Sequence, residues 1–96
     1  MIRGTINIRS ASNPGGDIDV YQVHFEELSG GTYDASMTLS GVEKLLYNTL
    51  RLNMEVDDLH KLIDELKRTG RMRIDDIETE EAELADAGLV YLPYAG

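Results

Sequence analysis

Apolar and polar residues alternate over the first nine positions of the chain. The apolar set is spaced two residues apart and consists of Ile2, Gly4, Ile6 and Ile8. A period of two over eight residues predicts a β-strand with one buried face. The Asn-Pro-Gly-Gly sequence that follows is typical of a loop, which we place at residues 10–17.

Two further alternating segments surround a pair of glycines, Gly30-Gly31. Residues 18–28 predict a second strand and residues 33–39 a third. A Gly-Gly turn between two such segments is a strong hairpin signal, so we expect the strands to pair antiparallel. The apolar phase slips near Val20, which predicts either a bulge there or partial cover of both sheet faces.

The period changes to that of a helix after residue 39. Apolar residues at helical spacing predict a helix over residues 41–52. Ser40 and Glu43 have the spacing of a capping box, which makes Ser40 the expected N-cap. Asn53 tolerates a left-handed backbone, so we expect a junction between two helices there.

A second helix is predicted over residues 55–68, again from its apolar stripe. Gly70 follows it and suits a C-terminal cap. Opposite charges four residues apart predict ion pairs on the exposed face. The expected pairs are Asp57 with Lys61 and Asp64 with Arg68.

Residues 71–78 predict a fourth strand, and a short helix follows with Thr79 as its expected N-cap. Gly88 is placed to end this helix, with the next apolar residue folding back on the last turn. Residues 89–92 are apolar and predict a final strand that Pro93 stops.

The predicted order is β-β-β-α-α-β-α-β. Hairpin strands with grouped helices favour an α+β fold, a two-layer sandwich whose mostly antiparallel sheet has helices packed on one face. Residues 1–96 fit a single compact α+β domain. The other sheet face is then exposed to solvent or to a ligand. The expected core consists of Ile6, Ile8, Val23, Phe25, Ala35, Met37, Leu45, Leu46, Leu59, Leu62, Ile63 and Leu66.

The excess of acidic residues is the most informative feature for function. Eighteen Asp and Glu residues stand against nine Lys and Arg residues, a net charge of −9 with both histidines neutral. Such a field repels nucleic acids and anionic membranes and attracts basic protein surfaces. Direct nucleic-acid binding needs a local basic stripe, and the sequence has none. We therefore expect a basic protein partner, and neither nucleic acid nor membrane.

The chain has no cysteine, which excludes disulfide scaffolds, thiolate zinc sites and thiol catalysis. Its first residues enter the alternating pattern directly, without the features of a signal peptide. No stretch approaches the roughly 18 apolar residues of a membrane span. We expect a cytoplasmic location.

Two histidines are the candidates for acid–base or metal chemistry. His24 lies in the second predicted strand, and His60 precedes Asp64 by four residues on the second predicted helix. Neither belongs to a metal-binding or catalytic motif, and no phosphate-binding glycine loop or nucleophile elbow is present. The sequence therefore predicts no catalytic residue, no metal and no cofactor.

Acidic residues concentrate between residues 75 and 86, where no basic residue occurs. This acidic segment is either a solvated surface or a negative surface that attracts a basic partner at a salt-sensitive rate. We take the second interpretation as the candidate partner-binding set. Its members are Asp75, Asp76, Glu78, Glu80, Glu81, Glu83 and Asp86.

Three functions follow from these features. The first is a small acidic non-enzymatic interaction protein, such as an inhibitor, an immunity-type protein or an accessory subunit. The second is a small enzyme or ligand-binding domain that uses His24 or His60 with nearby carboxylates. The third is an oligomeric structural module, for example a homodimer joined through sheet edges or through the C-terminal strand with Tyr91 and Tyr94.

Overall fold

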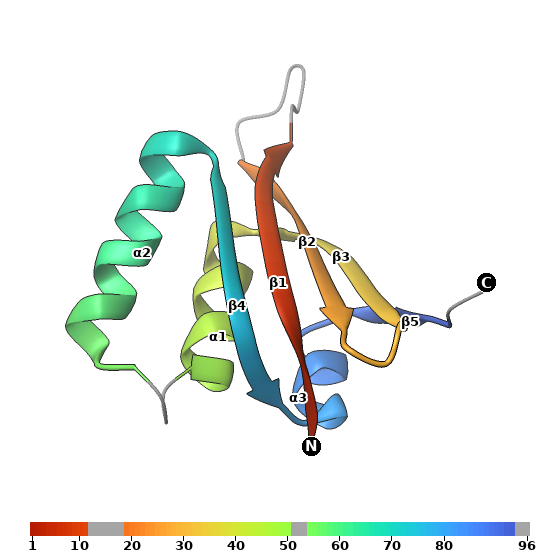
Figure 1. The fold of residues 1–96 in the computed structure, drawn as a ribbon. Helices are drawn as coiled ribbons and strands as arrows, with labels where there is room; N and C mark the ends of the chain where they lie inside the picture. The colour runs from red at the N-terminus through yellow and green to blue at the C-terminus, as the bar shows by residue number, and fades with distance from the viewer. Residues whose placement is uncertain (12–18, 51–53, 94–96) are drawn as a thin grey trace.

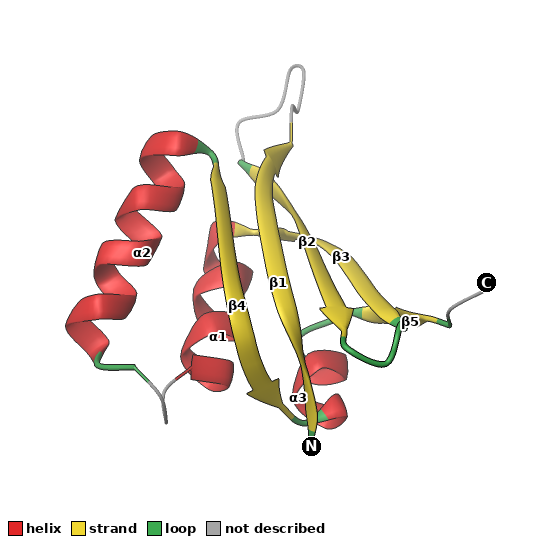
Figure 2. Cartoon of the chain, in the orientation of Figure 1, coloured by secondary structure: helices red, strands yellow, loops and turns green. Residues whose placement is uncertain are grey.

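The computed structural model describes residues 1–11, 19–50 and 54–93, which form one five-stranded sheet with three helices packed against it (Figure 1 and Figure 2). The strand order is β4-β1-β2-β3-β5, and all neighbours are antiparallel. The predicted α+β fold and element order are confirmed. The elements are β1 (Ile2–Ala11), β2 (Val20–Glu27), β3 (Thr32–Thr38), α1 (Leu39–Leu50), α2 (Val56–Thr69), β4 (Arg71–Thr79), α3 (Glu81–Asp86) and β5 (Val90–Leu92).

The predicted hairpin is formed by β2 and β3. β2 also pairs without interruption with β1, where Ser10 lies opposite Tyr21 and Ala11 opposite Val20. No bulge therefore lies at Val20, whose half-buried side chain is on the face away from the helices. β1 is longer than expected because β2 offers these last residues a partner. The rest of the predicted loop lies outside the described residues.

The N-cap prediction for α1 was wrong. The helix begins at Leu39, so Ser40 lies inside it. Thr38, the last residue of β3, accepts a hydrogen bond from the Gly41 amide on its Oγ1, at 3.4 Å. Because the chain passes from strand to helix without a connecting residue, the strand's last hydroxyl caps the helix. Residues 51–53, including the predicted junction, lie outside the described part of the chain.

The end of α2 is as predicted. Gly70 has a left-handed backbone with φ of 76°, and its amide donates to the Leu66 carbonyl. The predicted ion pairs of this helix were wrong: in the described residues Arg68 instead lies 3.9 Å from Glu65. Exposed long side chains gain little from any one pairing, so charge spacing alone does not select it.

A bulge in β4 reverses which residues face the core. Ile74 lies opposite Ile6, but the next core pair joins Ile77 to Gly4, so β4 has one residue more than β1 in this interval. Asp76, within the bulge, has φ of 56°. The bulge turns the end of β4 so that Ile77 faces the core and the two preceding aspartates face away.

The N-cap prediction for α3 was also wrong. Thr79 is the buried last residue of β4, and the cap position is Glu80. The Thr79 hydroxyl donates to Glu83 Oε2 at 3.0 Å, so it still binds the first turn of the helix through a side chain. The bulge is the reason, since it carries the strand and its ladder pairing one residue past the predicted end.

α3 ends as the sequence indicates. The Gly88 amide donates to the Ala85 carbonyl, and the Leu89 amide to the Leu84 carbonyl at 3.0 Å, the two hydrogen bonds of a Schellman motif. Gly88 has φ of 93°, and Leu89 is buried. The chain then enters β5, which pairs with β3 and confirms the predicted final strand.

The core lies between the sheet and the helices. Most predicted core residues are buried, while Ala35 and Met37 are partly buried and pack against the core. Leu62 is only partly buried and is not part of this core. The expected core list omitted several residues that are buried: Tyr21, Tyr33, Val42, Leu50, Ile77, Leu84 and Leu89. Among the described helices, none is long and apolar enough to cross a membrane.

Candidate functional site

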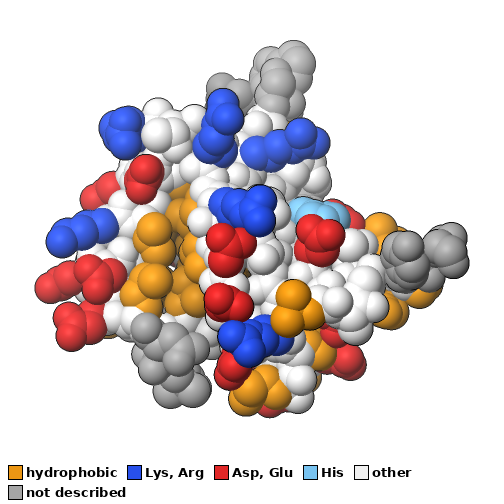
Figure 3. Space-filling model, viewed as in Figure 1, with side chains coloured by type: hydrophobic (Ala, Val, Ile, Leu, Met, Phe, Trp, Pro, Cys, Tyr) orange, Lys and Arg blue, Asp and Glu red, His pale blue; other side chains and the backbone are white. Residues whose placement is uncertain are grey.

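The sheet face away from the helices, which we call the open face, is mostly polar (Figure 3). Val90 and Leu92 of β5 also lie on it, opposite Asp34 and Thr32. The helices cover the opposite face, so strand positions that alternate with the core residues are exposed here. The register places the following side chains on it: Arg3, Thr5, Asn7, Arg9, Gln22, His24, Glu26, Thr32, Asp34, Ser36, Arg71, Arg73, Asp75 and Glu78.

His24 forms a close pair with Asp34 on this face. The two residues are opposite each other on β2 and β3, and His24 Nδ1 lies 2.6 Å from Asp34 Oδ1. An ionised carboxylate can only accept, so Nδ1 carries the proton and donates. Asp34 thereby fixes the ring orientation and the tautomer, which leaves Nε2 as an acceptor when the ring is neutral. No sequence pattern indicated this pair, because it depends on the register of β2 and β3.

His60 lies elsewhere, on the exposed side of α2. Its ring contacts the Tyr47 ring edge-on, with centroids 6.1 Å apart. It shares a shallow depression with Glu43 and Asp64, between α1 and α2. The two histidines therefore belong to different surfaces and do not converge on one pocket. Where residues are described, no three His, Asp or Glu side chains are grouped closely enough to hold a metal ion.

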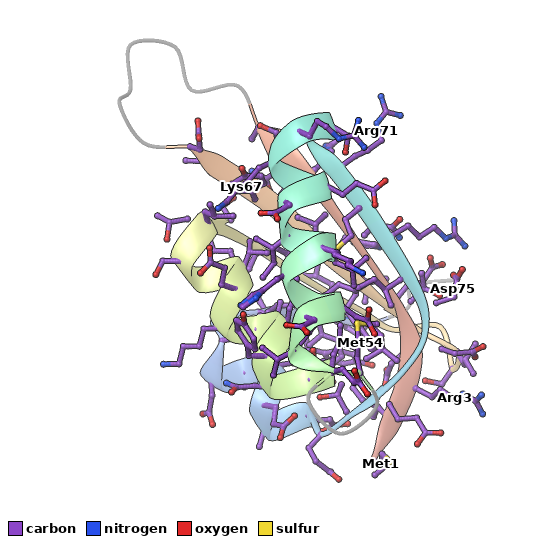
Figure 4. The ribbon with its side chains drawn as sticks, turned by 90° about the vertical axis from the view of Figure 1, so that its left-hand side faces the viewer. Met1, Arg3, Met54, Lys67, Arg71 and Asp75 are labelled. Carbon is purple, nitrogen blue, oxygen red and sulfur yellow. The ribbon has the colours of Figure 1, made fainter. Side chains whose placement is uncertain are left out.

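The strand part of the acidic segment is engaged with arginines. Asp76 Oδ1 lies 3.2 Å from Arg3, which also approaches Glu78 at 4.0 Å. Asp75 Oδ1 accepts from Arg73 Nε at 3.1 Å. Figure 4 shows Arg3 and Asp75 on the side of the sheet away from the helices. These acids are thus neutralised in part by cations on their own face.

The remaining acids surround α3. Glu80 lies 3.4 Å from the N-terminal ammonium group, and Glu83 accepts from Thr79. Glu81 lines a depression with Tyr33 and Tyr91, while Asp86 lines another with residues of α1. The bulge and the turn into α3 therefore distribute the seven predicted residues over two sides of the molecule.

β5 is the most apolar exposed strand. Val90, Tyr91 and Leu92 have exposed fractions of 61%, 48% and 50%. β5 is the last strand of the sheet and pairs on one side with β3. Its other side is a free edge within the described chain, which is a site for pairing with a further strand.

Two carboxylates lie near the Tyr91 ring of this strand. The Tyr91 ring packs on Tyr33, with centroids 4.9 Å apart, and beside Gly31. Glu81 lines a depression with Tyr33 and Tyr91, and the Glu27 carboxylate and the Tyr91 ring both lie beside Gly31. We call Glu27, Glu81, Val90, Tyr91 and Leu92 the β5 surface. Glu27 was missing from the predicted set because it comes close to Tyr91 only through the tertiary structure.

Burial raises the pKa of Tyr33 above its ordinary value of 10.0, and the charges of Glu81 and Glu27 add to this effect. Because the pKa of Tyr33 is higher in the folded than in the unfolded protein, it contributes unfolding free energy that is fully present below pH 10. This contribution is lost as the pH rises through the pKa of the folded protein. The wild-type protein should therefore lose unfolding free energy above about pH 10, and Tyr33→Phe should reduce that loss. Urea unfolding at pH 8 to 11 measures it. An unchanged slope in the variant would contradict the assignment.

No protein-family model matches the chain, and no curated protein or solved structure shows significant similarity to it.

Proposed function

We propose that the chain is a small non-enzymatic interaction protein that binds a basic protein partner at the β5 surface. The observation that supports this most is an edge strand of three consecutive exposed apolar residues, whose Tyr91 ring lies near Glu27 and Glu81. An extended segment can add to such an edge through main-chain hydrogen bonds, while its side chains give specificity.

Charge selects the kind of partner. Glu27 and Glu81 lie near the Tyr91 ring, and the chain has a net charge of −9. A partner segment that alternates basic and apolar residues would place apolar side chains on Val90 and Leu92. Its cations would meet the carboxylates and the long-range negative field, which raises association rates.

The other sheet edge is less suited to this role. β4 has a bulge at Asp75 and Asp76, and its outward residues include Arg71 and Arg73. Bulges and charged side chains are the usual means by which proteins block strand addition at an edge. β5 has neither feature in its three residues, which supports its choice as the docking strand.

The test uses a synthetic peptide of alternating lysine and valine, with a glutamate–valine peptide as the charge control. In two-dimensional NMR, the lysine peptide should shift the β5 amides, and Glu27→Lys with Glu81→Lys should weaken binding about tenfold or more. Binding should also weaken as the salt concentration rises.

The matched control is Asp58→Lys with Asp64→Lys on α2, which changes the net charge equally at exposed positions. This control should bind nearly as well as the wild type. Equal losses in both variants would show that only net charge matters. Equal binding of the two peptides, or shifts confined to β4, would reject the proposal. Self-association of the free protein through β5, seen by light scattering, would instead favour the homodimer.

A second candidate is a ligand-binding or enzymatic site at His24. The 2.6 Å contact with Asp34 favours it, because this pairing orients a histidine for acid–base work. No hydrogen bond joins Nε2 to another described residue, so the arrangement has a base and its orienting acid but no nucleophile in place. We therefore rank it second.

A further inference from the structure

Arginines gather on the open face although the chain as a whole is acidic. Four of the six arginines belong to β1 and β4 and lie on this face: Arg3, Arg9, Arg71 and Arg73. Figure 3 shows Lys and Arg side chains concentrated over the end of these strands nearest the α2–β4 turn. The two strands are far apart in the sequence, so this grouping arises from the register of β1 and β4.

Arg9 and Arg71 lie directly opposite each other in this register. Like charges at opposed positions destabilise an antiparallel pair. Neither residue forms an ion pair with another described residue. The two guanidinium groups at this end of the sheet therefore repel each other. A neutral residue at either position would remove the repulsion, and an anion bound between them would attract both groups.

The backbone holds this pair together. The Ser10 amide donates to the Gly70 carbonyl at 2.6 Å, which ties the end of β1 to the residue before Arg71. Gly70 in turn caps α2 with its left-handed backbone. Both arginines therefore start from fixed main-chain positions, so little backbone ordering is needed to bring their guanidinium groups to one ligand.

Arg73 and Asn7 extend the group. They lie opposite each other, two residues from Arg71 and Arg9 along their strands and on the same face. Asp75 Oδ1 accepts from Arg73 Nε at 3.1 Å and from the Thr5 hydroxyl at 3.1 Å. This contact orients the guanidinium through Nε and leaves its two terminal nitrogens able to donate. Asn7 adds a neutral amide that is half-buried between Arg73 and His24.

The surroundings limit the size of the ligand. A depression of about 400 Å³ lies beside Arg9 and is lined by Asn7, Arg9, Gln22, Val23, His24 and Asp34. Carboxylates surround the arginines on three sides: Asp34 across the sheet, Asp75 along β4, and Glu65 on α2 in the depression beside Arg71 and Arg73. A compact anion fits between these acids, whereas an extended polyanion such as RNA would be repelled by them.

We propose that Arg9, Arg71 and Arg73 form a binding site for the phosphate group of a small phosphorylated compound. Two arginine forks can each donate a pair of hydrogen bonds to phosphate oxygens, a geometry that a dianionic phosphate satisfies well. The remainder of the compound occupies the depression, where Gln22, Asn7 and His24 offer hydrogen bonds to hydroxyl groups. The three arginines belong to β4 and β1, at the opposite edge of the sheet from β5.

The experiment titrates the protein with inorganic phosphate and with glucose 6-phosphate, at an ionic strength held near about 0.15 M with chloride. NMR signals of the Arg9 and Arg71 Nε–H groups and of the Asn7 side-chain amide should shift in a saturable manner. Arg9→Gln with Arg71→Gln should weaken phosphate binding about tenfold or more, since each position loses charge-assisted hydrogen bonds. Tighter binding of the sugar phosphate would locate the organic part in the depression.

The matched control removes two cations elsewhere, by Lys44→Gln with Lys61→Gln at exposed positions of α1 and α2, and should retain the wild-type affinity. Arg71→Lys keeps the charge but loses the fork, so it should bind more weakly than the wild type. A further check is thermal: without phosphate, Arg71→Gln should melt at or above the wild-type temperature because it relieves the repulsion. The proposal is overturned if wild-type shifts do not saturate, or if the control loses as much affinity as the site variant.

Discussion

Leu59→Ala should lower the free energy of unfolding by about 2–5 kcal/mol, the range for removing a fully buried leucine side chain. Leu59 is completely buried where α2 packs on the sheet. The cost has two parts, the lost transfer of apolar surface from water and the cavity that the neighbours do not fill. Urea unfolding followed by circular dichroism measures it.

Leu62→Ala is the matched control, because it makes the same change one helical turn away. Leu62 is only partly buried and lines the depression beside β4, so solvent or neighbouring side chains can occupy the vacated space. Its loss should be smaller than that of Leu59→Ala by more than about 1 kcal/mol. Equal losses would show that α2 packs with a different face from the one described.

Gly4→Ala should be at least as damaging, costing about 3 kcal/mol or preventing folding. A Cβ atom at this position would lie 2.0 Å from the main-chain oxygen of Glu26 and 2.9 Å from the Phe25 ring. The first obstacle is backbone and the second is a core side chain, so neither can move without disturbing the β1–β2 pairing. The expected result is a large fall in melting temperature, or insoluble protein.

Gly41→Ala provides the comparison. Its added Cβ would meet the partly buried Met37 side chain at 3.1 Å, which requires a shift of a few tenths of an ångström. Alanine is also the better helix former by about 0.5–1 kcal/mol, so the net change should be small. A Gly4→Ala protein that melts like the Gly41→Ala protein would contradict the close approach of β1 and β2 at Gly4.

The predictions from sequence succeeded where the signal was local. The alternation around Ile6 and Ile8 identified a strand and its buried face. Gly70 and Gly88 identified helix ends, because both positions need a left-handed backbone that glycine adopts without strain. The predictions of Ser40 and Thr79 as N-caps were wrong because the position of a cap depends on where the preceding strand ends. The length of that strand is set by its pairing with the neighbouring strand.

The candidate surfaces could not be found in this way. No run of the sequence is basic, yet the pairing of β1 with β4 places Arg9 opposite Arg71. The contact of His24 with Asp34 likewise follows from the register of β2 and β3. The acidic segment, in contrast, is continuous in sequence but divided in space, because the bulge at Asp76 and the turn into α3 send its residues to different sides.

The sequence by itself determined the element types, their order, the α+β class and the net charge of −9, because periodicity, glycine conformation and composition are properties of short segments or of the whole chain. The tertiary structure decided which charged residues become neighbours, and that β4 and β5 are the two edge strands of the sheet. Those features depend on strand order and register, which are fixed by burying the core side chains together and not by any local pattern.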